Sequence, residues 1–260
     1  MSEPQRITSR DNALLVRARK LARTPGGYRK QDSLWLEGEH LCKALRARGR
    51  AAAQAIVSET AWQDASLRTL AQSATHAVVI PDALFGGVSP LESPAGIAFI
   101  IDVPQAPALQ PGAPTVVLDR VQDAGNVGSI LRSAAALGYT QVLALEGTAL
   151  LWSPKVVRAG MGAHFALDLV EGCTANDLGA ITVPLLAASS HAAASLAEAD
   201  LPFPCSWVFG HEGQGIAPAV LAHCAQTLRI PQPGGEESLN VAAAAAICLH
   251  AARGAAEWPR

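Results

Sequence analysis

Apolar residues follow two alternating patterns along most of the chain: short continuous runs, and longer stretches in which they recur every third or fourth position. The short runs predict buried strands, and the spaced stretches predict helices. The predicted strands cover residues 33–37, 55–58, 77–80, 95–103, 115–121, 141–145, 180–187, 206–210 and 227–230. The predicted helices cover residues 12–23, 38–48, 66–73, 125–138, 153–160, 191–199, 217–225 and 240–253. This alternation indicates an α/β protein whose second half forms a parallel sheet with helices on both faces.

A proline-rich stretch divides the chain into two predicted domains. Residues 104–114 contain four prolines, which prevent a helix and leave few donors for a strand ladder. We therefore expect an interdomain linker at 104–114, a small α/β domain at 1–103 and a larger α/β domain at 115–260. A chain of 260 residues is long enough for both.

Charge is distributed unevenly along the chain. Residues 1–50 hold 12 Lys and Arg against 5 Asp and Glu, whereas residues 51–260 hold 8 against 17. A basic amino-terminal segment on a mildly acidic body indicates a surface that faces a polyanion. A solvated helical face would show the same charges, and the composition leaves both interpretations open.

Several classes of protein are disfavoured by what the sequence lacks. The five cysteines form no CxxC pair and no Cys/His cluster, so we expect no disulfide framework, no metal site and a reduced, cytoplasmic protein. The polar start of the chain has no apolar signal core, and the longest apolar run, 241–249, is too short to span a bilayer. The phosphate-loop and dinucleotide patterns are absent, which leaves ATP and NAD without a recognisable cradle.

The first of three informative segments runs from Asn126 to Arg132, in the first turns of the predicted helix 125–138 that follows a predicted strand. Asn126 follows a tight turn and is a candidate N-cap for that helix. Arg132 lies among small apolar residues, where an unpaired guanidinium is costly, so it needs an acceptor or an anion. That partner is either a structural carboxylate, from Asp119, Asp123 or Glu212, or the phosphate or ribose of a ligand.

The second segment, residues 209–215, is a glycine-rich loop after a predicted strand. Its three glycines permit positive φ angles and a close approach of the backbone to a ligand. Glu212 is either a solvated turn carboxylate or an acceptor for Arg132 or a ligand hydroxyl. We interpret His211 as a loop residue, not as a catalyst.

The third segment, residues 230–241, leaves a strand through an irregular, proline- and glycine-rich loop and enters an alanine-rich helix. Asn240 is a candidate N-cap of that helix. In an extended backbone Ser238 and Asn240 point to one side, and Leu239 points to the other.

Together the three segments resemble the SpoU/TrmH-type branch of the SPOUT superfamily, the RNA ribose 2′-O-methyltransferases. The matching motifs are Asn126-x-Gly128-x-x-x-Arg132, Gly210-x-Glu212-x-x-Gly215, and Ile230-Pro231 followed by Ser238-Leu239-Asn240-Val241. Residues 153–159 and 1–103 are similar to further stretches of the family, although Ala159-Gly160 replaces its usual hydroxylated residue and alanine. The resemblance implies a SPOUT α/β domain with a deep trefoil knot at its carboxyl end, S-adenosylmethionine bound in that knot, and a homodimer.

The resemblance also implies roles for individual residues. The implied cofactor-binding residues are Gly210, Glu212, Gly215, Ile230 and Leu239. The implied catalytic residues are Arg132, Asn126, Glu212, Ser238 and Asn240. Family precedent assigns Arg132 to activation of the ribose 2′-hydroxyl. Because a guanidinium with a pKa above about 12 is normally a donor, binding the adjacent phosphate and stabilising a forming alkoxide is the physically easier role.

RNA is the partner that the resemblance implies, and the basic first fifth of the chain would hold its phosphates. The candidate residues are Arg6, Arg10, Arg17, Arg19, Lys20, Arg23, Arg29 and Lys30. We expect ribosomal RNA as the substrate, because a separate amino-terminal domain suits that subgroup, with tRNA as the alternative. A non-catalytic RNA-binding or ribosome-assembly protein on the same fold is expected to lack Arg132, Glu212 or Asn240, and all three are present.

Overall fold

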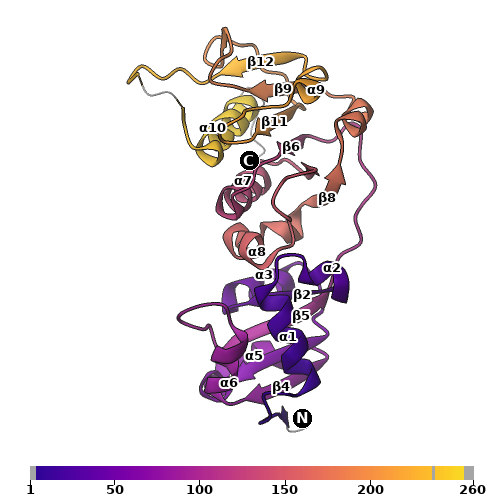
Figure 1. The fold of residues 1–260 in the computed structure, drawn as a ribbon, viewed down its shortest axis with the longest axis vertical. Helices are drawn as coiled ribbons and strands as arrows, with labels where there is room; N and C mark the ends of the chain where they lie inside the picture. The colour runs from indigo at the N-terminus through magenta and orange to yellow at the C-terminus, as the bar shows by residue number, and fades with distance from the viewer. Residues whose placement is uncertain (1–3, 236–237, 255–260) are drawn as a thin grey trace. The chain divides into compact units, whose positions relative to one another are not determined.

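The computed structural model describes residues 4–235 and 238–254, which form two compact units. One unit comprises Met1–Gln105 with Trp152–Phe165, and the other comprises Ala106–Leu151 with Ala166–Arg260 (Figure 1). The sequence predicted two continuous domains, whereas in the structure residues 152–165 belong to the first unit. Helix α8 (Pro154–Gly160) lies within the predicted larger domain but packs on elements of the first unit. The role of residues 104–114 as a linker between two functional domains stays a prediction.

The first unit is built around a five-stranded mixed sheet. Its strands pair in the order β1 (Gln5–Arg6), β4 (His76–Ile80), β3 (Gln54–Ser58), β5 (Ile97–Asp102) and β2 (Ser33–Glu37). The first three run parallel, and β5 is antiparallel to both β3 and β2. Its other helices are α1 (Ala13–Arg23), α2 (Gly27–Gln31), α3 (Glu39–Ala47), α4 (Glu59–Gln63), α5 (Ala65–Ala71) and α6 (Asp82–Val88).

Helix α1 shows how the sequence pattern produces this unit. The side chain of Asn12 accepts from the N–H of Leu14 at 2.9 Å and so caps the helix. Leu15, Ala18 and Leu21, at helical spacing, are fully or almost fully buried in the core cluster of the sheet. The polar positions between them carry the arginines and the lysine, which leaves most of the positive charge on the outer face of α1.

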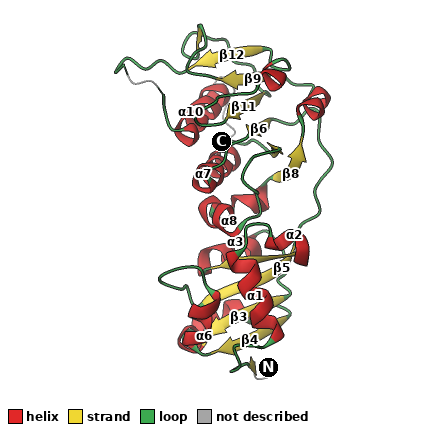
Figure 2. Cartoon of the chain, viewed as in Figure 1, coloured by secondary structure: helices red, strands yellow, loops and turns green. Residues whose placement is uncertain are grey.

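The second unit contains a seven-stranded sheet in which every strand pair is parallel. The order is β10 (Ala194–Ser195), β12 (Gln226–Arg229), β9 (Leu185–Ala188), β11 (Ser206–Gly210), β6 (Thr115–Asp119), β7 (Gln141–Leu145) and β8 (Asp168–Cys173). Its helices are α7 (Ala124–Ala136), α9 (Pro218–Leu221), α10 (Val241–Gly254) and the 3-10 helix η2 (Ala175–Ala180), while a second one, η1 (Ala163–Ala166), lies at the unit boundary. The predicted α/β class with a parallel sheet is confirmed (Figure 2).

Helices cover the sheet on two sides. Val220 of α9 and Leu178 of η2 join Val117 and Val208 of the central strands in one core cluster. Helices α7 and α10 pack on each other and lie together on the side of the sheet away from α9 (Figure 1). This close packing of α10 is consistent with the expected trefoil knot, which itself stays a prediction.

Two expectations for this unit are wrong. Residues 191–199 were expected to form a helix, but they form turns and the short edge strand β10. Residues 194 and 195 pair with β12 instead, and Arg229 of that strand donates to the carbonyl groups of Ala192 and Ala193. The pattern also missed β8, because polar residues and a glycine interrupt its apolar positions.

The parallel sheet places the three informative segments at one edge. The first segment lies in α7, the helix that follows β6, and the second and third segments continue from the ends of β11 and β12. The carboxyl ends of parallel strands lie at the same edge of a sheet. None of the helices in the described part of the chain is long and apolar enough to cross a membrane. Among the same residues, no group of three or more His, Cys, Asp or Glu side chains is arranged to hold a metal ion.

Candidate active site

A pocket of about 640 Å³ opens at the carboxyl edge of the parallel sheet. Its walls are the segment after β9, the glycine loop after β11, and the loop between β12 and α10. The pocket is lined by all five residues predicted to bind a cofactor, which are Gly210, Glu212, Gly215, Ile230 and Leu239. Ser238 and Asn240 from the predicted catalytic set also line it. A volume of this size is typical of sites for small molecules and cofactors.

Gly210 occupies a position with no room for a side chain. A Cβ atom there would lie 2.5 Å from the carbonyl carbon of Gly215 and 2.6 Å from the N of Ile216. The two backbone segments of the glycine loop therefore pass each other directly beside the pocket. A side chain at position 210 would push these segments apart and displace the pocket wall that Gly210 and Gly215 share.

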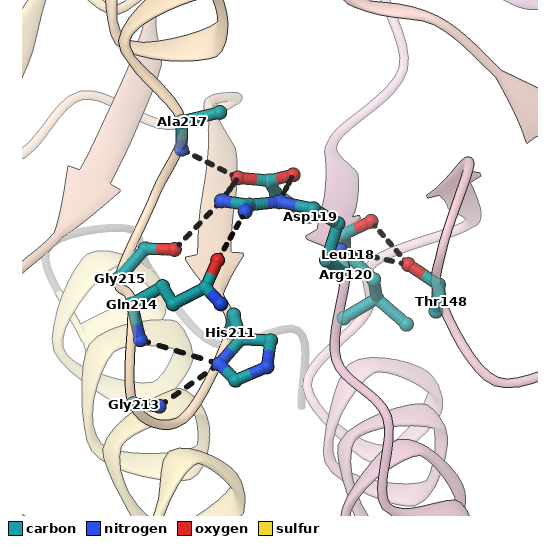
Figure 3. Close-up of polar contacts among 9 residues, drawn as sticks. All are labelled: Leu118, Asp119, Arg120, Thr148, His211, Gly213, Gln214, Gly215 and Ala217. Carbon is teal, nitrogen blue, oxygen red and sulfur yellow. Dashed lines mark hydrogen bonds and ion pairs between the residues drawn. The ribbon is translucent and has the colours of Figure 1, made fainter.

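His211 closes the glycine loop into a tight turn. Its backbone exchanges hydrogen bonds with Gly215, at 3.1 and 2.8 Å, and its Nδ1 accepts from the N–H groups of Gly213 and Gln214 at 3.0 and 3.2 Å (Figure 3). With Nδ1 used as an acceptor, the imidazole shapes the loop. This arrangement agrees with the interpretation of His211 as a loop residue.

A chain of side-chain hydrogen bonds joins the three segments. Nδ2 of Asn240 donates to Oδ1 of Asn126 at 2.9 Å, and Nδ2 of Asn126 donates to Oε1 of Glu212 at 3.0 Å. Asn240 also caps α10, because its Oδ1 accepts from the N–H of Ala242 at 2.9 Å. The expectation that Asn126 caps α7 is wrong: Asp123 is the N-cap and accepts from the N–H of Asn126 at 2.7 Å.

The carboxylate of Glu212 is held in its ionised form. Burial raises its pKa, but hydrogen bonds from the Asn126 side chain and from the backbone N–H groups of Glu212, Gln122 and Asp123 lower it more. The net result is a pKa below the ordinary value of a glutamate. At neutral pH this group is therefore an acceptor, and it fixes the amide orientation of Asn126.

The expectation that Arg132 lies among apolar residues and needs a partner there is wrong, because its side chain is exposed on α7. It makes no hydrogen bond or ion pair with any residue in the described ranges. The three carboxylates considered as its structural partners are engaged elsewhere. Asp119 pairs with Arg120, Asp123 caps α7, and Glu212 accepts from Asn126. The guanidinium is thus available to an anion from outside the chain. Arg132 and Asn126 do not line the pocket itself.

Comparison with known proteins agrees with this geometry. Residues 113–250, more than half of the chain, match the SpoU rRNA Methylase family. The chain belongs to this family.

Relatives of the SpoU chain match it over nearly its full length. A protein named uncharacterized tRNA/rRNA methyltransferase from Synechocystis is 31% identical over 95% of this chain and 93% of its own. The 23S rRNA (guanosine(2553)-2′-O)-methyltransferase RlmP of Bacillus subtilis is 30% identical over 86% of this chain and 90% of its own. The solved structure of a putative RNA methyltransferase of the TrmH family from Porphyromonas gingivalis is 30% identical, with a TM-score of 0.80 over 94% of this chain and 98% of that one. The predicted family is confirmed.

The sequence interpretation missed one wall of the pocket in this SpoU domain. Ser189, Ser190 and His191 line it directly after β9. The sequence pattern that could have identified them is three polar residues directly after an apolar run, because ligand sites lie at the carboxyl ends of parallel strands. The mistaken helix at 191–199 hid that signal, because it assigned His191 to regular structure. Gln232, from the loop after β12, and Ala244 of α10 also line the pocket.

The basic residues of the first unit divide into two groups. Arg17, Arg19 and Arg23 donate to backbone carbonyls of the same unit; Arg23 alone contacts the carbonyls of Gly87, Val88 and Ser89 at 3.2, 3.2 and 2.6 Å. Arg6 pairs with Glu59, Arg10 pairs with Asp11, and Arg29 donates to Tyr28. Within the described part of the chain, the ammonium groups of Lys20 and Lys30 have no such partner.

Proposed function

We propose that this SpoU protein transfers a methyl group from S-adenosylmethionine to a ribose 2′-hydroxyl of ribosomal RNA. The observation that carries the proposal is the hydrogen-bonded chain Asn240–Asn126–Glu212, which joins all three motifs beside the pocket. Membership of the SpoU rRNA methylase family and the similarity to RlmP, named as a 23S rRNA 2′-O-methyltransferase, support the same reaction.

The pocket fits S-adenosylmethionine in size and in chemistry. The cofactor supplies an electrophilic methyl group on a sulfonium. Gly210, Gly215, Ile230 and Leu239, which line the pocket, would hold it, and the two glycines put no side chain between the cofactor and the backbone. Glu212, ionised at neutral pH, favours a positively charged ligand nearby.

Arg132 acts on the RNA side of the reaction. Its unpaired guanidinium binds the phosphate adjacent to the target ribose and stabilises the negative charge that develops on the 2′-oxygen. The Asn240–Asn126–Glu212 chain and Ser238 position the loop and helix ends around the reacting groups. As a permanently charged donor, Arg132 orients and stabilises the 2′-oxygen and does not accept its proton. That proton passes to solvent water as the bond from the methyl group to the sulfonium breaks and the bond to the oxygen forms.

Several wider assignments belong to the same proposal. The first unit holds RNA phosphates through its basic face, the protein works as a homodimer, and it is cytoplasmic. Transfer RNA is the second candidate substrate, because the Synechocystis relative is named as a tRNA/rRNA methyltransferase. A non-catalytic RNA-binding protein is disfavoured because all three motif side chains Arg132, Glu212 and Asn240 are retained.

The deciding experiment follows methyl transfer from labelled S-adenosylmethionine into separated ribosomal and transfer RNA pools. The parent protein should label ribosomal RNA at a single ribose. Arg132→Ala should lower the rate by a factor of about 100 or more while S-adenosylmethionine still binds, and Arg132→Lys should recover part of the activity.

Each outcome of this experiment has a clear meaning. Label in the transfer RNA pool alone would replace the preferred substrate, and label in neither pool would favour the binding-protein alternative. Full turnover by Arg132→Ala would remove Arg132 from the catalytic set. Lost cofactor binding in that variant would instead assign Arg132 to the cofactor site.

A further inference from the structure

Arg120, directly after strand β6, has a backbone conformation that is unusual for an arginine. Its φ angle of 59° lies in the left-handed region, which side chains other than Gly, Asn and Asp rarely adopt. Its N–H donates to Oγ1 of Thr148 at 3.0 Å, and that hydroxyl donates to the carbonyl of Leu118 at 2.9 Å. The end of β6 is thus fixed in a shape that directs the Arg120 side chain toward the glycine loop (Figure 3).

The guanidinium of Arg120 bridges the Asp119 carboxylate and the glycine loop. Nε donates to Oδ1 of Asp119 at 2.9 Å and Nη2 donates to Oδ2 at 3.1 Å, the paired geometry of a strong ion pair. Nη1 donates to Oε1 of Gln214 at 2.9 Å, and Nη2 donates to the carbonyl of Gly215 at 3.2 Å (Figure 3). Asp119 is buried, and its Oδ2 also accepts from the N–H of Ala217 at 2.6 Å.

These hydrogen bonds restrain a part of the pocket wall that is not held in place by buried side-chain packing. Residues 212–215 are exposed, so few buried contacts hold them in place. Glu212, at the start of this stretch, is held by Asn126. Beyond the turn made by His211, the contacts that tie Gln214 and Gly215 to the end of β6 come from Arg120, and Asp119 holds the following backbone at Ala217. Gln214 and Gly215 both line the pocket, so the position of this wall depends on the ion pair.

We propose that Arg120 is a positioning residue of the cofactor pocket, which holds Gln214 and Gly215 in the conformation that receives S-adenosylmethionine. The inference rests on the proposed function, since it assigns the pocket to that cofactor. A loop that must become ordered on binding lowers affinity. Loss of the Arg120 contacts should therefore weaken cofactor binding and leave the methyl-transfer step at saturating cofactor almost unchanged.

The test is isothermal titration calorimetry of S-adenosylmethionine with matched variants. Arg120→Gly removes the guanidinium and also relieves the φ of 59°, which offsets part of the stability lost when the buried Asp119 carboxylate loses its partner. We expect a roughly tenfold weaker Kd, with kcat at saturating cofactor within about twofold of the parent. Arg120→Lys keeps a charge beside Asp119 but lacks the planar fork, and should recover part of the affinity.

Asp32→Gly is the matched control, because it relieves another left-handed φ angle, 46°, in the first unit. Its affinity for S-adenosylmethionine should equal that of the parent. An unchanged Kd in Arg120→Gly, or an equal loss in Asp32→Gly, would overturn the positioning role. So would a fall in kcat without a change in Kd. A parent protein that binds no S-adenosylmethionine would instead contradict the proposed function.

Discussion

At the scale of single residues, the site depends on positions where only one kind of side chain fits. Gly210 has a backbone neighbour where a Cβ would be, and Asn126 links a donor and an acceptor from two other segments. An amide can serve both bonds at once because it carries one acceptor and one donor group. Neither requirement is visible in the residue alone, since glycine and asparagine are common in any loop.

Gly210→Ala should damage the pocket, whereas Gly213→Ala should not. The first variant places a Cβ 2.5 Å from backbone carbon of Gly215, while the second places it 3.8 Å from the His211 ring. We expect Gly210→Ala to lower the free energy of unfolding by about 1–3 kcal/mol and to weaken S-adenosylmethionine binding by about tenfold or more. Urea unfolding and calorimetry would measure both effects, and equal behaviour of the two variants would contradict the steric argument.

At the scale of elements, the alanine-rich helix α10 is packed through small side chains. Ala245, Cys248, Leu249 and Ala252 are buried at helical spacing, and the helix contacts α7, β9 and β11. Small residues let neighbouring backbones approach closely, so the narrow face of α10 sets its distance from the sheet. The same helix begins at Asn240, and its packing therefore fixes one end of the hydrogen-bonded chain in the site.

Enlarging a buried alanine of α10 should destabilise the second unit. Ala245 is fully buried, whereas Ala243, two residues earlier on the same helix, is exposed. Ala245→Leu should lower the free energy of unfolding by about 1–3 kcal/mol through overpacking, and Ala243→Leu should change it by less than about 0.5 kcal/mol. Denaturant unfolding of both variants provides the measurement. A tolerated Ala245→Leu would show that α10 has room to move.

At the scale of the whole molecule, the contacts within the first unit decide which of its basic side chains remain available to bind RNA. Most of its predicted RNA-binding arginines are already committed to internal contacts, and Arg23 in particular ties α1 to the carbonyls of residues 87–89. Net charge still attracts a polyanion, because an internally bonded arginine keeps its charge. The side chains free to bind a phosphate directly are nevertheless fewer than the composition indicates.

Lys20 and Lys30 should contribute to RNA affinity, while Lys43, already paired with Glu39, should contribute little. Each of Lys20→Gln and Lys30→Gln should weaken binding to ribosomal RNA about uniformly across sequences and reduce the slope of log K against log salt by roughly one. Filter binding at several salt concentrations would measure this, with Lys43→Gln as the control. Unchanged slopes for both lysines would place the RNA on another surface.

The sequence by itself determined the family, the parallel sheet and the three segments that hydrogen bonds join beside the pocket. These features are carried by apolar periodicity and by the order of the Asn126, Glu212 and Asn240 motifs, and both are local or linear properties of the chain. The same local reasoning misassigned Asn126 as an N-cap, because capping depends on which neighbour, here Asp123, reaches the free N–H groups first.

Only the tertiary structure decided the partners of these residues. Residues about a hundred positions apart form the bonds of Asn126 with Glu212 and of Arg120 with Gln214, and no pattern within the sequence specifies such pairs. The helix expected at 191–199 failed for the same reason, because residues 194 and 195 pair with the distant strand β12 as an edge strand. Linear patterns show which side chains reach an edge of the sheet, and the packing of distant segments selects their contacts.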